Sequence, residues 1–226
     1  WASAAVSPLS GYKFSATEGG IRVPMIVAWP GNEAVRRGAV VSAMAHVTDI
    51  APTIIEASGA GAHGTAWAGR AAEPISGTSL MRVLTGTAER VHGDDAPLGY
   101  ELSGNAALFR GSYKLVKNLP PIGDGRWRLF DIESDPGETR NLAAANPALF
   151  AEMQADYAAY AARDGVLAMP AGYTYNDQIN ANAFENVMKP KLIWLGAWVC
   201  GALGLLVGLW WWRRRRWRGG GISNVQ

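Results

Sequence analysis

The chain has 226 residues, of which 49% are hydrophobic and 18% are charged, and its formal net charge is +2. This length suits one domain or two small ones, and the composition is typical of a folded protein, which excludes a disordered one. Residues 1–188 carry 14 basic and 19 acidic side chains, whereas residues 189–226 carry seven basic and no acidic ones. The body is therefore mildly acidic. We expect no nucleic-acid partner, because proteins that bind nucleic acids present a basic face.

The chain has one cysteine, Cys200, and three histidines, His46, His63 and His92. A single cysteine cannot form an internal disulfide, and the histidine spacing does not fit a Cys/His zinc site. We expect a local structural role for each histidine. The first residue is Trp1, and no charged and apolar regions of a signal peptide follow it, so we expect the sequence to be the end of a longer protein.

The first hundred residues contain few regular elements. Residues 22–29 form a short apolar run between two turns rich in Gly and Pro, which predicts a buried strand. A helix is predicted from Asp49 as N-cap to Gly59 as C-cap. Residues 60–96 are rich in loops, and a short helix is predicted around Ser79–Leu84. These elements resemble the edge of an α/β unit that lacks enough strands of its own.

From residue 98 the pattern changes to short strands separated by turns of hairpin length. The predicted strands are residues 98–102, 106–110, 113–117 and 126–131. They predict an antiparallel sheet of three or four strands. Asn146 and Pro147 then begin a helix with one apolar stripe, which extends to about Arg163 and covers one face of the sheet. Residues 166–188 are predicted to be an irregular tether.

The C-terminal region predicts a membrane helix. Leu192 to Trp212 reads LIWLGAWVCGALGLLVGLWWW, which is 21 residues without a charge or a proline. At about 1.5 Å per residue, this length spans the hydrocarbon core of a bilayer. Tryptophans lie near both ends of the segment, where indoles occupy the membrane interface. A buried core helix is the alternative, but it rarely runs directly into four arginines such as Arg213–Arg216.

The flanks of this span predict its orientation. Five arginines follow the span, whereas only Lys189 and Lys191 precede it. The C-terminus should therefore be cytoplasmic, and residues 1–188 should be periplasmic or otherwise extracytoplasmic. The pair Gly204 and Gly208 allows a homodimer in which two such helices pack closely, although glycines are common in membrane helices.

Residues 11–31, GYKFSATEGGIRVPMIVAWPG, are the most informative segment of the body. Lys13 lies on a predicted loop, five residues before Glu18, and a Gly-Gly turn leads from there into the predicted strand. This order places an ammonium group near the end of a sheet, where α/β folds gather their ligands. From composition alone, a solvated surface lysine is the simpler interpretation.

Five segments in the same order resemble the sulfatase family, especially bacterial arylsulfatases. Together they cover roughly residues 1–167. They are GYKFSATEGGIRVP (11–24), HVTDIAPTIIEASG (46–59), ISGTSLMRVLTG (75–86), LGYELSGNAALFRGSYKLV (98–116) and WRLFDIESDPGETRNLAAANPAL (127–149).

The resemblance implies an α/β fold of the alkaline-phosphatase-like type. A large α/β domain is followed by a small four-stranded antiparallel sheet with a packed helix. The family hydrolyses sulfate esters with a formylglycine made from Cys or Ser in a C/S-x-P-x-R motif, beside a calcium ion. In this sequence Lys13 matches the family lysine that contacts the substrate sulfate, where a fixed cation would neutralise charge on the sulfate oxygens.

The departures from the family pattern are equally informative. No C/S-x-P-x-R motif occurs in the chain, and Cys200 lies in the predicted membrane span. The nucleophile and the calcium ligands are therefore expected upstream, outside this chain. The motif residues interpreted as scaffold are Glu18, Gly19, Gly20, Arg22 and Pro24, with Arg22 ion-paired to Glu18. The matching residues Glu101, Lys114 and Asp131 are also expected to be structural.

We therefore predict the C-terminal part of a membrane-anchored sulfatase that acts on small sulfate esters, with aryl sulfates as the expected class, and that is inactive as this chain alone. Alternatives are a phosphodiesterase or phosphonate monoester hydrolase of the same superfamily, or a non-catalytic membrane-tethered binding protein. The predicted regions are the edge of the catalytic domain (1–60), a connection (61–97), the sheet-plus-helix subdomain (98–167), the tether (168–191), the membrane helix (192–212) and a basic tail (213–226).

Overall fold

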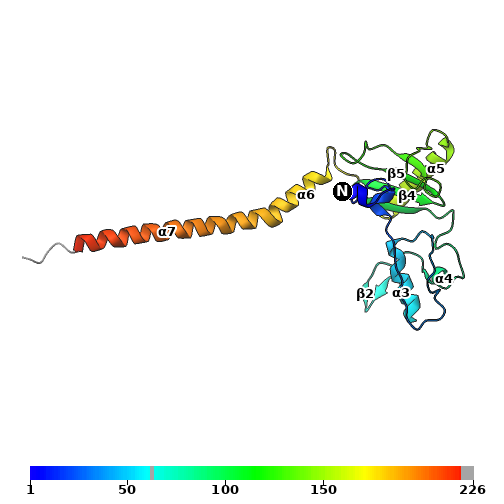
Figure 1. The fold of residues 1–226 in the computed structure, drawn as a ribbon, viewed down its shortest axis with the longest axis horizontal. Helices are drawn as coiled ribbons and strands as arrows, with labels where there is room; N and C mark the ends of the chain where they lie inside the picture. Colours follow the sequence, from blue (N-terminus) through cyan, green and yellow to red (C-terminus); the bar gives the residue numbers. More distant parts are fainter. Residues whose placement is uncertain (62–63, 220–226) are drawn as a thin grey trace, which may run out of the picture. The chain divides into compact units, whose positions relative to one another are not determined.

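The computed structural model describes residues 1–61 and 64–219 and divides the chain into two compact units (Figure 1). Unit 1 is Trp1–Ala168, and unit 2 begins at Met169. The helices of unit 1 are α1 (Ala2–Ala5), α2 (Glu18–Ile21), the 3₁₀ turn η1 (Val47–Asp49), α3 (Ile50–Ser58), α4 (Met81–Leu84) and α5 (Pro147–Arg163). Its strands are β1 (Ala66–Trp67), β2 (Arg70–Ala71), β3 (Leu98–Leu102), β4 (Asn105–Arg110), β5 (Tyr113–Lys117) and β6 (Arg128–Asp131).

A four-stranded antiparallel sheet organises unit 1. Its strands follow one another in the order β3-β4-β5-β6, each paired with its neighbour in the chain. Leu102 pairs with Asn105, so a two-residue turn of Ser103 and Gly104 joins the first hairpin. Both turn residues have positive φ, which matches the right-handed twist of the strands. The short runs and hairpin-length turns of the sequence correctly predicted all four strands, although the last one begins at Arg128 instead of residue 126.

The two faces of the sheet are buried by different segments. Successive strand residues point to opposite faces, so β4 and β5 contribute to both cores. On one face, Leu108, Leu115 and Leu129 pack with Met153 of α5, and Figure 1 shows α5 beside the strands. On the other face, the strands pack against Ala16, which lies on the segment preceding α2. The N-terminal segment therefore closes the second half of the core.

The strand predicted over residues 22–29 is wrong. In the structure this segment is extended but pairs with no other strand within the described residues, and it is largely exposed. The side chains of Val23 and Ile26 are 77% and 93% exposed. A strand needs a hydrogen-bonding neighbour, and no described segment provides one here.

Unit 2 is helical from Tyr175 onward. It consists of α6 (Tyr175–Ala183), the π-helical turn η2 (Phe184–Met188) and α7 (Lys189–Gly219). The irregular tether predicted for this region is therefore wrong beyond residue 174. Thr174 caps α6 by accepting a hydrogen bond from the Asp177 amide, and neither Gly nor Pro interrupts the next fourteen residues. The wider π turn precedes Pro190, whose missing N–H and ring disturb a regular helix.

The described part of unit 2 contains a helix that is long and apolar enough to cross a membrane. It runs over Tyr175–Arg216, and its most apolar stretch buries nothing within the structure. This finding rests on the length and composition of the helix alone, so it suggests a membrane anchor only weakly.

Gly99 on β3 provides a test of the packing between the sheet and α5. A Cβ added at Gly99 would lie 2.4 Å from the ring of Tyr160, so the ring or the helix would have to move. We expect Gly99→Ala to destabilise unit 1 by about 1–3 kcal/mol, as overpacking in other cores does. Gly93→Ala is the matched control, because nothing lies within 4 Å of its Cβ position and its φ is not positive. Chemical denaturation of both variants measures the difference, and equal stabilities would contradict this packing.

Candidate functional site

Lys13 lies on a turn between Gly11 and Ser15, and its side chain is exposed. Its ammonium lies 5.3 Å from the centre of the Phe14 ring. Within the described residues, no carboxylate lies close enough to form an ion pair with it. The turn therefore presents a cation that an anionic group can approach.

The backbone of this turn is held in an uncommon conformation. Phe14 has a φ of +75°, which is rare for a bulky residue and clusters at functional sites in proteins. Two buried asparagines from the sheet region hold it in place. Asn105 Nδ2 donates to the Phe14 carbonyl at 2.8 Å, and Asn118 Oδ1 accepts from the Ala16 amide at 2.7 Å. The sheet region therefore fixes the backbone on either side of Ser15, two residues after Lys13.

Close backbone packing requires glycine at both positions of the Gly19-Gly20 pair. The Gly19 amide donates to the Ser10 carbonyl at 2.7 Å, which closes the segment into a loop. A Cβ at Gly19 would lie 2.5 Å from the Ser10 carbonyl oxygen, and one at Gly20 would lie 2.1 Å from the Ser15 carbonyl oxygen. We call residues 10–22 the Lys13 loop.

A buried group of three charges fastens the Lys13 loop to the sheet. Lys114 on β5 is fully buried, and its Nζ lies 2.8 Å from Glu18 Oε1 and 2.9 Å from Glu138 Oε1. Glu138 Oε2 also accepts a hydrogen bond from the Glu18 amide at 2.7 Å. The ammonium lies 5.1 Å from the centre of the Phe109 ring, which adds a cation–π contact. We call Glu18, Lys114 and Glu138 the Lys114 cluster.

The Lys114 cluster contains more acidic than basic groups, with two carboxylates around one ammonium. Burial raises the pKa of Glu138 above its usual range, while the nearby Lys114 charge and the Glu18 amide oppose that rise. Arg22 supplies a second positive charge, 3.5 Å from Glu18 Oε2, but its side chain is half exposed. The predicted ion pair of Arg22 and Glu18 is confirmed, although Lys114 is the closer partner of Glu18. The structural role predicted for Lys114 is also confirmed.

Lys114→Met tests the cluster. The substitution leaves two buried carboxylates without their cation, and breaking a buried pair in this way typically costs about 3–5 kcal/mol. Lys117→Met on the same strand is the matched control, since Lys117 is only partly buried and contacts the Trp127 ring at 4.8 Å. Urea denaturation should show a much larger loss for Lys114→Met. A loss equal to that of the control would mean that the cluster does not hold unit 1 together.

Another buried carboxylate, Asp49, links the turn before α3 to two other segments. It accepts hydrogen bonds from the His46 amide and the Thr78 amide, both at 2.7 Å, and lies 2.8 Å from His92 Nε2. Asp49 precedes α3 as predicted, but its side chain does not cap that helix. Thr53, one turn later, accepts from the Leu80 amide at 2.8 Å. Asp49 and Thr53 therefore attach α3 to the segment before α4.

His46 and His92 have the local structural role that was predicted for them. Burial is the main cause that lowers the pKa of His46, which favours its neutral form. His63 lies outside the described residues. Within those residues, no three His, Cys, Asp or Glu side chains gather as a metal site.

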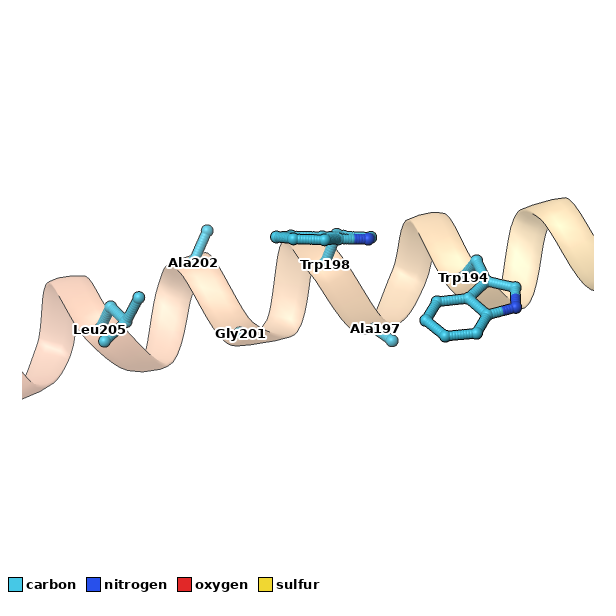
Figure 2. Close-up of a pocket in the computed structure, with 6 residues that line it drawn as sticks. All are labelled: Trp194, Ala197, Trp198, Gly201, Ala202 and Leu205. Carbon is cyan, nitrogen blue, oxygen red and sulfur yellow. The ribbon is translucent and has the colours of Figure 1, made fainter.

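A shallow apolar hollow lies along one side of α7, and Figure 2 shows the side chains around it. It is lined by Trp194, Ala197, Trp198, Gly201, Ala202 and Leu205. All six residues belong to one helix, and none is an acid, a base or a nucleophile. The hollow therefore offers no chemistry for a reaction, so the Lys13 loop remains the candidate site.

Sequence analysis expected structural roles for Glu18 and Lys114, but it missed three other residues that hold the Lys13 loop. Asn105 reads as part of a hairpin turn, Asn118 as the end of a strand, and Glu138 as part of a turn after Asp135-Pro136-Gly137. Glu138 has a positive φ of 55°, so the turn before it carries its side chain inward. The available signal for such a residue was a polar side chain that matches the family motif although it lies beside strongly apolar strands in the sequence.

Comparisons with known proteins agree with this organisation. Residues 13–158 match the family model described as N-sulphoglucosamine sulphohydrolase, C-terminal. An uncharacterised sulfatase of Schizosaccharomyces pombe is 33% identical over 172 residues, which cover 75% of this chain and 30% of that protein. The matched region of the family model includes Lys13 and the whole Lys114 cluster.

Two solved structures extend the comparison. The crystal structure of Ps i-CgsB in complex with k-i-k-neocarrahexaose is 27% identical, with a TM-score of 0.55, over 68% of this chain and 32% of that one. A Bacteroides thetaiotaomicron structure, described with the metabolism of multiple glycosaminoglycans, is 21% identical, with a TM-score of 0.53, over 67% of this chain and 32% of that one. The second likeness concerns the fold alone. The chain spans about a third of the length of these relatives.

Proposed function

Because this chain belongs to the N-sulphoglucosamine sulphohydrolase C-terminal family of sulfatases, we propose that it is the C-terminal part of an enzyme that hydrolyses sulfate esters. The observation that carries this proposal is the Lys13 loop, a partly buried segment that is held by the Lys114 cluster and presents one exposed ammonium. In this proposal Lys13 contacts the sulfate group of the substrate.

The chemistry suits a lysine at this position. Negative charge develops on the sulfate oxygens and the leaving group as the S–O bond breaks, so a fixed cation stabilises the transition state more than the ground state. The Lys114 cluster holds the Lys13 loop in place, and it does so without placing a carboxylate against Lys13. An ammonium that moved freely in water would have to be ordered again in each reaction.

The exposed apolar segments support a larger catalytic domain around residues 1–60. Val23, Ile26, Val40 and Ile54 are each more than 60% exposed. An exposed apolar surface of this kind normally packs against another one. We propose that the large α/β domain of the complete sulfatase covers it, with residues 61–97 as the connection and residues 98–167 as the subdomain that supports the Lys13 loop.

Formylglycine and calcium would belong to that upstream domain. The described residues do not fit a calcium site, since no group of three or more suitable side chains gathers among them. No C/S-x-P-x-R motif is present either. We therefore assign no catalytic step in this chain to either group, and the chain alone should turn over no sulfate ester.

The substrate class remains a choice between aryl and saccharide sulfates. The family model carries the name of an enzyme that acts on N-sulphoglucosamine, and the Ps i-CgsB structure contains a carrageenan-type hexaose. These names favour a sulfated saccharide over the simple aryl sulfate predicted from sequence. Assay of the complete protein with an aryl sulfate, a sulfated oligosaccharide and an aryl phosphodiester separates these classes and also tests the phosphodiesterase alternative. Absence of all three activities would favour a membrane-tethered binding protein.

Lys13→Ala tests the proposed sulfate contact in the complete sulfatase. Loss of one electrostatic contact of this kind lowers the rate by about a hundredfold to a thousandfold, so kcat/KM should fall by that factor. Lys13→Arg should recover only part, since a planar guanidinium does not occupy the position of a compact ammonium. The melting temperature should not change, because the side chain is exposed.

Arg37→Ala serves as the matched control for that experiment. Arg37 is an exposed cation of the same unit, and it pairs with the exposed Glu33 at 3.2 Å. Its removal should leave kcat/KM within about twofold of wild type, as surface substitutions usually do. A folded Lys13→Ala enzyme with the kcat/KM of the control would exclude Lys13 as a sulfate contact.

We also propose that α7 anchors the protein in a membrane through Leu192–Trp212, with residues 1–188 extracytoplasmic. The charge difference between the flanks supports this orientation, since five arginines follow the span and two lysines precede it. Homodimer formation through Gly204 and Gly208 stays a prediction.

Reporter fusions test the proposed topology. A reporter that is active only outside the cytoplasm should be silent when fused at Gln226, whereas the same reporter fused at Tyr175 should be active. Protein levels of the two fusions, measured with an antibody, provide the control. Activity of the Gln226 fusion would reverse the orientation, and activity of neither fusion would place the body in the cytoplasm.

A further inference from the structure

The C-terminal end of α7 carries an ordered series of aromatic and cationic side chains. Trp210, Trp211 and Trp212 are followed directly by Arg213–Arg216, and all these side chains are exposed. Three arginines stack on the indole four positions earlier. The distances from guanidinium carbon to ring centre are 4.9 Å for Arg214 on Trp210, 3.6 Å for Arg215 on Trp211 and 4.1 Å for Arg216 on Trp212.

This stacking fixes the depth of the charges along the helix. Side chains on a helix lean toward its N-terminus, so each guanidinium lies beside the indole that precedes it instead of extending away from the span. Indoles at the ends of membrane helices occupy the level of the lipid headgroups. The cation–π contacts therefore hold the arginines at headgroup level, given the proposed membrane anchor on which this inference rests.

The four arginines also surround the helix. Consecutive residues of an α-helix are about 100° apart around its axis, so four in a row cover its whole circumference within about 5 Å of its length. No acidic residue occurs anywhere from residue 189 to the C-terminus. A protein partner would contact one side of the helix, whereas headgroups approach a membrane helix from every side.

We propose that Arg213–Arg216 form a collar that binds phospholipids with anionic headgroups around the end of α7. Each guanidinium can donate two hydrogen bonds to one phosphate, and it keeps its charge at every physiological pH. Clusters of this size next to a membrane span recruit anionic lipids. The collar thereby selects the lipids beside the anchor, in addition to setting its orientation.

The association of spin-labelled lipids with the complete chain in phosphatidylcholine vesicles tests the collar. The chain should bind labelled phosphatidylglycerol at least about threefold more strongly than labelled phosphatidylcholine, and the preference should disappear as the salt concentration rises from about 0.05 M to about 0.5 M. Replacing all four arginines (R213Q, R214Q, R215Q and R216Q together) should lower the ratio to about one. The double variant K189Q and K191Q, at the opposite end of the span, is the matched control and should keep the ratio.

Single variants distinguish a collar from a one-sided site. Each Arg→Gln substitution should remove a similar share of the preference, and replacing the three tryptophans by leucine should reduce it by about half.

Loss of the whole preference with one substitution, or retention of the preference in the quadruple variant, would overturn the collar. Equal binding of both lipids by a chain that floats with neutral vesicles would overturn the collar alone. Failure to float with neutral vesicles would overturn the anchor as well.

Discussion

The buried ammonium of Lys114 is the constraint on which the rest of unit 1 depends. A charge removed from water needs close partners, and Glu18 and Glu138 provide them at 2.8 Å and 2.9 Å. Glu18 belongs to the N-terminal segment, Lys114 to the middle of the sheet, and Glu138 to the turn after it. The pairing therefore forces three distant parts of the chain to meet at one point, and the Lys13 loop can take only one position on the sheet.

The support of Lys13 is indirect. None of the charged groups of the Lys114 cluster contacts its ammonium, and the neighbouring backbone is held by Asn105 and Asn118 instead. This separation suits the proposed contact with an anion, since a carboxylate at Lys13 would compete with the substrate. Positive φ at Phe14 is the local cost of the arrangement, and the hydrogen bonds to its carbonyl and from the Ala16 amide offset that cost.

Sequence patterns predicted the regular elements well. Short runs separated by hairpin-length turns between residues 98 and 131 predicted the strands, and a single apolar stripe predicted α5, because these signals lie close together in the chain. The family resemblance singled out Lys13, and it marked Glu18 and Lys114 as structural. It did not single out Asn105, Asn118 or Glu138. Local patterns contain no signal for contacts such as that of Glu138 with Glu18, which are 120 residues apart. The strand over residues 22–29 failed for the same reason, since a strand depends on partners that its own residues do not specify.

A double-mutant cycle on the complete sulfatase tests the central claim, that the Lys114 cluster acts on the proposed reaction by positioning Lys13. Glu138→Gln keeps the shape of the side chain but weakens its hold on Lys114 and on the Glu18 amide. Stability must be checked at the assay temperature, so that only folded enzyme is compared. We predict that Glu138→Gln lowers kcat/KM severalfold when Lys13 is present. It should have almost no further effect on the Lys13→Ala enzyme, because that enzyme has no ammonium at residue 13 for the cluster to position. Equal losses of kcat/KM in both backgrounds would contradict the account.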